Sequence, residues 1–112
     1  MSAIKDWKAY SEALRGRGKE LGQLHPEIVK GFVALNNGAA KTTHLDAKMR
    51  EFISLAVAVT TRCDGCIDAH VRKALAAGAT KEEIAEVMGV AVAVNAGAAF
   101  TYALHVMDRA TE

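Results

Sequence analysis

Residues 51–70 read EFISLAVAVTTRCDGCIDAH, and this stretch decides the fold, because an apolar helix is followed almost at once by the start of another. Asp46 is a good N-cap for the first helix, which we predict over residues 47–61. The second helix is predicted from Asp64 to about Ala77, with Gly78 as its C-terminal stop. The stretch therefore predicts consecutive helices joined by a very short turn.

The residues before this stretch also have helical patterns. One helix is predicted around residues 4–14 and is expected to end at Gly16-Arg17-Gly18. Pro26 suits the first turn of another helix, and Asn36-Asn37-Gly38 should end that helix. A polar connector at residues 41–44 then leads to Asp46.

The residues after it continue in the same way. Thr80 and Glu83 form a capping box that opens a further helix, expected to end near Val94. Asn95-Ala96-Gly97 should break the pattern before a last helix over residues 98–109. With almost no strand-like alternation anywhere, the prediction is an all-α fold.

The cysteine pair is the clearest chemical signal. Both cysteines of the chain lie in one C-x-x-C motif, Cys63 and Cys66, and His70 follows four residues after the second. On a helix, residues four apart share a face, so His70 is a base within reach of the Cys66 thiol. Exposed amides and the helix dipole at a helix N-terminus favour a thiolate, the species that attacks peroxides and disulfides.

Glu51 is the second candidate for chemistry, since it opens a stretch that looks buried. Twelve residues of helix span about 18 Å, so Glu51 cannot reach Cys63 directly. It approaches His70 only if the two helices fold back as an antiparallel hairpin, and burial would then bring its pKa toward the range of proton transfer.

Alternatives stay open for each of these residues. In the alternative interpretation, Cys63 and Cys66 are inert buried cysteines and His70 is a core histidine. Glu51 is then a solvent-facing residue in the first turn of its helix. The two cysteines and His70 are also possible zinc ligands, with Glu51 or water as a fourth. A second ligand pair is missing, however, so we expect no metal and no cofactor.

Composition narrows the function classes. The chain has 112 residues, of which 51% are hydrophobic, and its formal net charge is +1 without a basic block, so nothing suggests a nucleic-acid partner. The longest apolar runs fall short of the roughly 20 residues that span a bilayer, so no membrane partner is expected. A soluble cytoplasmic protein is the expectation, and a cysteine pair in that compartment favours catalysis or metal binding.

Two predicted helices are apolar nearly all round, around residues 52–59 and 84–94. A helix without a polar face is normally buried, and a chain of this length has little interior in which to bury two. We therefore expect neighbouring subunits to cover some of this surface, which predicts a homo-oligomer.

Taken together, Glu51, the apolar helix after it, Thr61-Arg62-Cys63-x-x-Cys66-x-x-x-His70 and Gly78-Ala79-Thr80-x-x-Glu83-Ile84 resemble the AhpD-like, carboxymuconolactone decarboxylase superfamily. The resemblance covers residues 45–104 well and the N-terminal third loosely. It implies a single AhpD-like helical domain over residues 1–112 that assembles as a trimer, hexamer or other ring.

The resemblance also implies alkylhydroperoxidase-type activity. It assigns sulfenic acid formation to Cys66, the roles of proton donor and disulfide partner to Cys63, and a proton relay to Glu51 and His70. Well-studied members carry another histidine just before the second cysteine, where this chain has Gly65.

The expected function is therefore a thiol-dependent peroxidase or disulfide reductase that acts on organic hydroperoxides in antioxidant defence and is reset by an external dithiol. Two alternatives remain at this point: a non-enzymatic, redox-responsive helical oligomer, and a carboxymuconolactone-decarboxylase-like lyase. The decarboxylase branch of the superfamily generally lacks the C-x-x-C, which disfavours the lyase.

Overall fold

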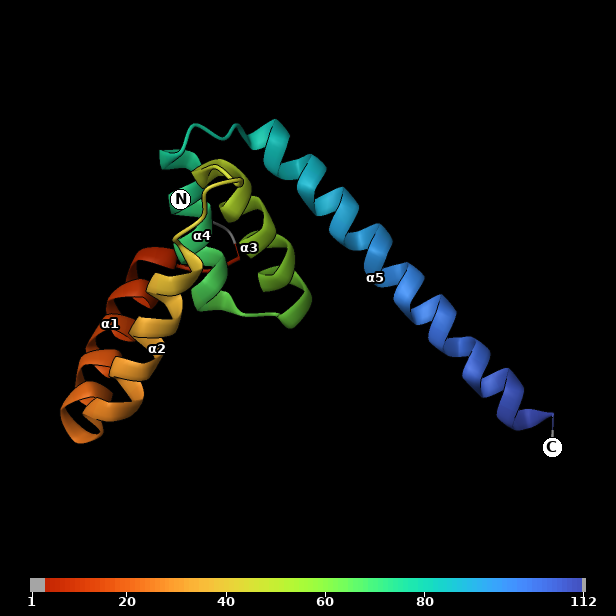
Figure 1. Ribbon diagram of the computed structural model, residues 1–112, viewed down its shortest axis with the longest axis horizontal. Helices are drawn as coiled ribbons and strands as arrows, with labels where there is room; N and C mark the ends of the chain where they lie inside the picture. The colour runs from red at the N-terminus through yellow and green to blue at the C-terminus, as the bar shows by residue number, and fades with distance from the viewer. Residues whose placement is uncertain (1–3, 112) are drawn as a thin grey trace. The chain divides into compact units, whose positions relative to one another are not determined.

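The computed structural model describes residues 4–111, and these residues form α-helices and no strands. The helices are α1 (Trp7–Leu24), α2 (Pro26–Ala39), α3 (Ala47–Thr61), α4 (Asp64–Ala76) and α5 (Lys81–Ala110) (Figure 1). The predicted all-α fold is confirmed. The chain divides into two compact units, with the boundary between Arg50 and Glu51.

The first unit is built on α1 and α2. Asp6 caps α1 by accepting a hydrogen bond from the Ala9 N–H at 3.1 Å. The predicted end of this helix at Gly16-Arg17-Gly18 is wrong, because α1 continues to Leu24. A glycine inside a helix costs about 1 kcal/mol relative to alanine but does not remove a hydrogen bond, so good helix formers on both sides carry the helix through it.

The second unit is organised around α3, α4 and the first turns of α5. Its core consists of the buried residues Leu55, Ala74 and Ala79. Packed against them are Phe52, Val71, Ile84 and Met88, which come from all three helices. Small alanines at the centre let the helices approach closely, and this core fixes α4 against α3.

The turn between α3 and α4 is very short. Arg62 adopts a left-handed conformation with φ 54°, and the Cys63 N–H donates back to the Ala58 carbonyl at 3.0 Å. This is the hydrogen bond of a Schellman helix end, in which the chain reverses immediately after the last helical turn. Cys63 is also the N-cap of α4, so the same residue completes the C-terminal motif of α3 and begins α4.

The capping box of α5 is present as predicted: the Thr80 hydroxyl accepts from the Glu83 N–H, and the Glu83 carboxylate accepts from the Thr80 N–H, both at 3.0 Å. The predicted break at Asn95-Ala96-Gly97 is wrong, because α5 is one continuous helix. The Asn95 amide donates to the Thr60 hydroxyl and to the Ala91 carbonyl, both at 2.8 Å. A tertiary partner on α3 thus satisfies a side chain that we expected to compete with the helix backbone.

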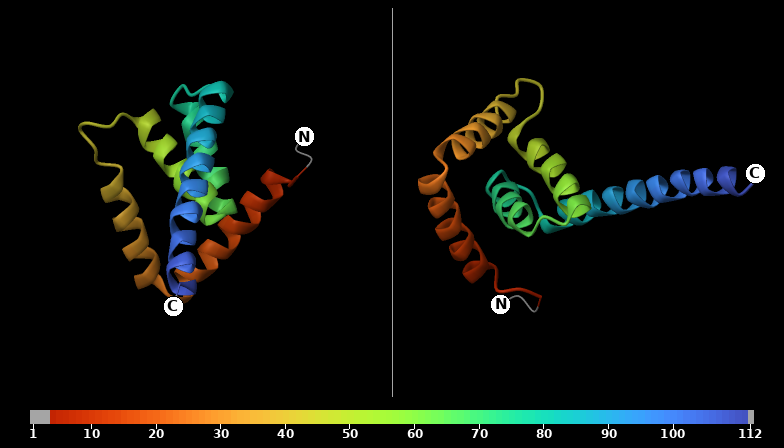
Figure 2. Two further views of the ribbon diagram at one scale, coloured as in Figure 1. Left: turned by 90° about the vertical axis from the view of Figure 1, so that its right-hand side faces the viewer. Right: turned by 90° about the horizontal axis from the view of Figure 1, so that it is seen from below.

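Beyond Ala91 every described residue of α5 is exposed within the chain, and this part of the helix extends away from α3 and α4 (Figure 2). The longest apolar runs of the sequence lie in different helices, but the helices predicted to end near Val94 and to span residues 98–109 join in one 30-residue helix with a mean hydropathy of 1.7 over its most apolar window. By length and composition alone, α5 is therefore able to cross a membrane, contrary to the expectation from the separate runs.

Candidate functional site

The second unit brings all four predicted residues together. Glu51 lies in the first turns of α3 and His70 two turns into α4, and the His70 Nδ1 is 2.6 Å from the Glu51 Oε2. The side chain of Glu51 is 15% exposed, and that of His70 is 23% exposed. The alternative of a solvent-facing Glu51 is therefore wrong, because its carboxylate is largely buried and paired with the imidazole.

This pair exists because of the short turn at Arg62. The reversal lays α4 back against α3, so a residue near the start of α3 meets one in the middle of α4 across nineteen positions of sequence. A carboxylate bound to one ring nitrogen fixes the orientation of the imidazole and leaves the other nitrogen to exchange protons. His70 is thus arranged as a proton carrier.

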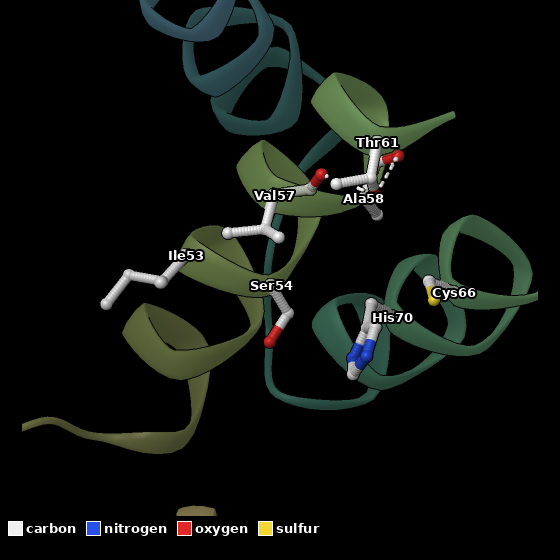
Figure 3. Close-up of a pocket in the computed structure, with 7 residues that line it drawn as sticks. All are labelled: Ile53, Ser54, Val57, Ala58, Thr61, Cys66 and His70. Atoms are coloured by element: carbon white, nitrogen blue, oxygen red, sulfur yellow. Dashed lines mark hydrogen bonds between the residues drawn. The ribbon is translucent and has the colours of Figure 1, made fainter. Parts of the chain in front are cut away.

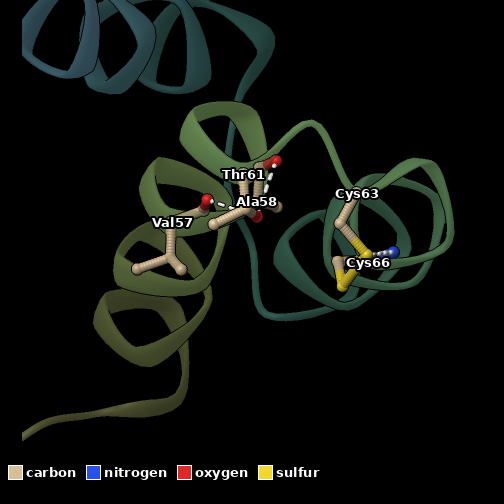
Figure 4. Close-up of a disulfide and its surroundings, with 5 residues drawn as sticks. All are labelled: Val57, Ala58, Thr61, Cys63 and Cys66. Atoms are coloured by element: carbon tan, nitrogen blue, oxygen red, sulfur yellow. Dashed lines mark hydrogen bonds between the residues drawn. A yellow bond between two sulfur atoms is a disulfide. The ribbon is translucent and has the colours of Figure 1, made fainter. Parts of the chain in front are cut away.

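Cys63 and Cys66 form a disulfide, with their Cα atoms 5.2 Å apart (Figure 4). The Cys66 N–H also donates a hydrogen bond to the Cys63 Sγ at 3.2 Å, so the sulfur of Cys63 caps the N-terminus of α4. The disulfide thus lies at the N-terminus of α4, within its first turn.

A pocket of about 270 Å³ adjoins the disulfide and the histidine (Figure 3). The residues lining it are Ile53, Ser54, Val57, Ala58, Thr61, Cys66 and His70. Figure 3 shows Ile53, Ser54 and Val57 along α3, and Cys66 and His70 on the neighbouring α4. Ile53 and Val57 are 48% and 56% exposed, so the rim of the pocket is apolar and open.

The α3 side of this pocket was not predicted from the sequence. Ile53, Val57 and Thr61 recur at intervals of four residues, which marks one helical face, but the same spacing describes an ordinary core stripe. The Thr61 hydroxyl donates to the Val57 carbonyl at 3.0 Å, so it is occupied within its own helix. Cys66 and His70 thus bring a sulfur and an imidazole to the pocket, and α3 contributes the rest of its lining.

Charged residues adjoin the disulfide in the sequence. Asp68 on α4 is paired with Arg72 at 3.1 Å. Arg62, next to Cys63, makes no ion pair with the residues that the structure describes. Asp64 follows Cys63 and adds a negative charge to the first turn of α4. The disulfide therefore has a basic residue directly before it in the sequence and an acidic residue between its two cysteines.

The zinc alternative requires several ligands to converge. Within residues 4–111, no three His, Cys, Asp or Glu side chains form a group that could hold a metal ion, and the two sulfurs are bonded to each other.

The fold and the site together define a class: a small all-helical protein whose disulfide, histidine and glutamate meet between two antiparallel helices. Residues 26–109 match the carboxymuconolactone decarboxylase family. The chain belongs to this family, and so to the AhpD-like superfamily that its sequence resembles.

Individual relatives agree with this assignment. A protein of Haemophilus influenzae described as uncharacterised is 46% identical over 92% of this chain and 91% of its own length. The crystal structure of an apo carboxymuconolactone decarboxylase family protein from Legionella pneumophila has a TM-score of 0.75 and 32% identity, covering 88% of each chain. A structure from Methanobacterium thermoautotrophicum has a TM-score of 0.70, also with 32% identity, over 75% of this chain and 94% of that one.

Proposed function

We propose that this protein is a thiol-dependent peroxidase that reduces organic hydroperoxides to alcohols and is reset by an external dithiol. The observation that carries the proposal is the placement of the redox pair. Cys66, one half of the disulfide, lines the same pocket as His70, and His70 is held by Glu51 at 2.6 Å. A redox-active cysteine and a proton carrier thus line the same cavity, which is available to a substrate.

In the oxidative half of the cycle, the Cys66 thiolate attacks the terminal oxygen of the peroxide. The O–O bond breaks, Cys66 becomes a sulfenic acid, and the leaving alkoxide takes a proton to become an alcohol. Cys63 then attacks the Cys66 sulfur and expels hydroxide, which is protonated to water, and the disulfide closes. Two thiols supply the two electrons, so the reaction needs no cofactor.

The residues divide this work. Cys66 is the nucleophile, and Cys63 supplies the proton for the alkoxide and forms the disulfide. His70 carries protons between the pocket and solvent, with Glu51 orienting its ring and balancing its charge. Gly65 occupies the position before Cys66, so His70 is the imidazole that this chain offers next to the nucleophile.

The pocket favours an organic hydroperoxide as substrate. Ile53, Val57 and Ala58 give it an apolar wall, against which an alkyl or aryl group gains free energy by leaving water. Hydrogen peroxide has no such group to bury. The proposed role is therefore the removal of organic hydroperoxides in antioxidant defence.

The proposal also includes the cellular compartment and the oligomeric state of the protein. A dithiol that resets the disulfide is maintained in a reducing compartment, so we place the protein in the cytoplasm. The exposed apolar surface of α5 favours a homo-oligomer, a trimer or a hexamer, over a single chain in water.

Steady-state turnover tests the proposal. Reduced protein, cumene hydroperoxide and dithiothreitol should give continuous peroxide loss, and the Cys66→Ser variant should give none while it stays folded. Equal loss in wild type and Cys66→Ser would remove the central role of the thiols. Closure of the disulfide by peroxide without repeated turnover would favour the redox-responsive oligomer instead.

A further inference from the structure

The two sulfurs of the disulfide lie in different surroundings, and the difference begins with Cys63. Its sulfur accepts the Cys66 N–H at 3.2 Å, as the N-cap of α4. Its backbone is held on both sides, because its N–H donates to the Ala58 carbonyl at 3.0 Å and its carbonyl accepts the Ile67 N–H at 2.9 Å. Cys63 is therefore fixed in place by α3 and α4 independently of the disulfide.

Cys66 differs from Cys63 in its access. It lines the pocket of about 270 Å³ together with His70, and Cys63 is not among the residues lining that pocket. Figure 3 shows Cys66 among the residues that line the pocket, and Figure 4 shows its sulfur bonded to the sulfur of Cys63. A molecule that enters the pocket meets the Cys66 end of the S–S bond first.

The surroundings also decide which sulfur leaves more readily as a thiolate. A thiolate at Cys63 keeps the hydrogen bond from Cys66 N–H and lies at the positive end of the dipole of α4. Arg62 precedes it without an ion pair among the described residues. Asp64 opposes a thiolate at either cysteine. On the pocket side Cys66 has His70, which is paired with the Glu51 carboxylate, so any positive charge on the ring is offset by that carboxylate. The better-stabilised thiolate is the faster leaving group.

We propose that reduction of this disulfide is directional: the incoming thiolate attacks the Cys66 sulfur, and Cys63 leaves. The S–S bond breaks, its electron pair goes to the Cys63 sulfur, and a mixed disulfide forms between the reductant and Cys66. The second thiol of the dithiol then attacks the reductant's own sulfur and closes its disulfide. The expelled Cys66 thiolate takes a proton delivered through His70.

This inference rests on the proposed function in that it describes how the same site is reset. It makes Cys66 the carrier of both covalent intermediates of the cycle, the sulfenic acid and the mixed disulfide. Cys63 bonds only to Cys66. In the reduced protein, the Cys63 thiolate is also the group that accepts the proton that Cys66 must lose before it attacks a peroxide.

The mixed disulfide itself gives the test. Oxidised wild-type protein is mixed briefly with 2-mercaptoethanol, quenched with acid, alkylated with N-ethylmaleimide at low pH and mapped by mass spectrometry. The adduct should lie on Cys66 and the alkyl group on Cys63, with a preference on the order of tenfold or more. Equal labelling, or a majority of adduct on Cys63, would overturn the proposal.

A second measurement follows thiolate absorbance near 240 nm against pH in two single-cysteine variants. Cys66→Ser, which keeps Cys63 and the backbone donor, should form its thiolate at lower pH than Cys63→Ser; the reverse order contradicts the proposal. Neither measurement uses a peroxide. If the adduct lies on Cys66 but the protein does not turn over peroxide, only the proposed function is refuted. If the protein turns over peroxide normally but the adduct lies on Cys63, only this inference is refuted.

Discussion

At the scale of single residues, Glu51 makes the sharpest prediction. Glu51→Gln removes the charge that faces His70 and nearly preserves shape, so hydroperoxide turnover should fall on the order of 100-fold or more. The fold should persist, because the amide still fills the site and still offers an oxygen to the ring. Turnover and thermal stability of this variant are measured side by side.

Glu86→Gln is the matched control, since Glu86 is exposed in α5 and contacts neither thiol. It should leave turnover unchanged. Normal turnover in Glu51→Gln would reduce the site to Cys63, Cys66 and His70, and would make the 2.6 Å contact a purely structural one.

His70 allows a second test at this scale. His70→Gln keeps a polar side chain but cannot carry a proton near neutral pH, so the pH dependence of turnover should flatten as its rate falls. His105→Gln, at a histidine stacked on Tyr102 in α5, is the control. A variant as active as wild type at every pH would exclude His70 as the proton carrier.

The proximity of the two cysteines and the histidine was predictable because their signal is local. Cys63, Cys66 and His70 lie within eight positions on one helix, so spacing alone places them together. The contact of Glu51 depended on whether two helices fold back. The α3 wall of the pocket was not predictable, since Ile53 and Val57 have the pattern of ordinary core residues until the position of α4 is known.

At the scale of elements, the α3–α4 turn has a measurable cost. Arg62 has φ 54°, a conformation that costs an L-residue about 1–2 kcal/mol and that glycine adopts freely. Arg62→Gly should therefore raise the free energy of unfolding by about 0.5–1 kcal/mol, since glycine's greater freedom in the unfolded chain offsets part of the gain. Denaturant unfolding measures the change.

Gly78 provides the opposite test. It ends α4 with φ 92°, and a Cβ added there would meet nothing within 4 Å. Gly78→Ala should therefore destabilise the protein by about 1 kcal/mol through backbone conformation alone. If both substitutions shift stability in the same direction, the left-handed geometry of one of the two turns is wrong.

Helix starts were predicted well and two helix ends were not, for a physical reason. The caps at Asp46 and Thr80 are satisfied within three residues of sequence, so a local pattern contains the whole interaction. The break expected at Asn95 fails because its partner Thr60 lies 35 positions away. A polar residue satisfied by a distant helix cannot be told from a helix breaker by sequence alone.

At the scale of the whole molecule, α5 is the dominant feature. Its exposed large apolar residues include Val94, Phe100, Leu104 and Val106. A surface of this kind is unstable in water unless something covers it, and we predict that copies of the chain do so. Light scattering without detergent should give at least three times the 11.9 kDa mass of one chain.

Phe100→Glu tests the same assembly by placing a charge on that surface. It should dissociate the oligomer or make it much weaker, whereas Lys81→Glu, at the exposed start of α5, should leave it intact. A monodisperse wild-type monomer, or a protein that stays in solution only with detergent, would contradict self-assembly and turn attention to a membrane as the cover for α5.

The account as a whole depends on the thiols reacting with a peroxide, and one single-turnover measurement tests this most directly. Reduced protein is mixed with one equivalent of cumene hydroperoxide, and peroxide, alcohol and free thiols are counted. We predict one alcohol formed and two thiols lost per chain, with Cys63 and Cys66 joined, and full recovery of the thiols on adding dithiothreitol. Peroxide left unconsumed by a folded, fully reduced protein would contradict the account.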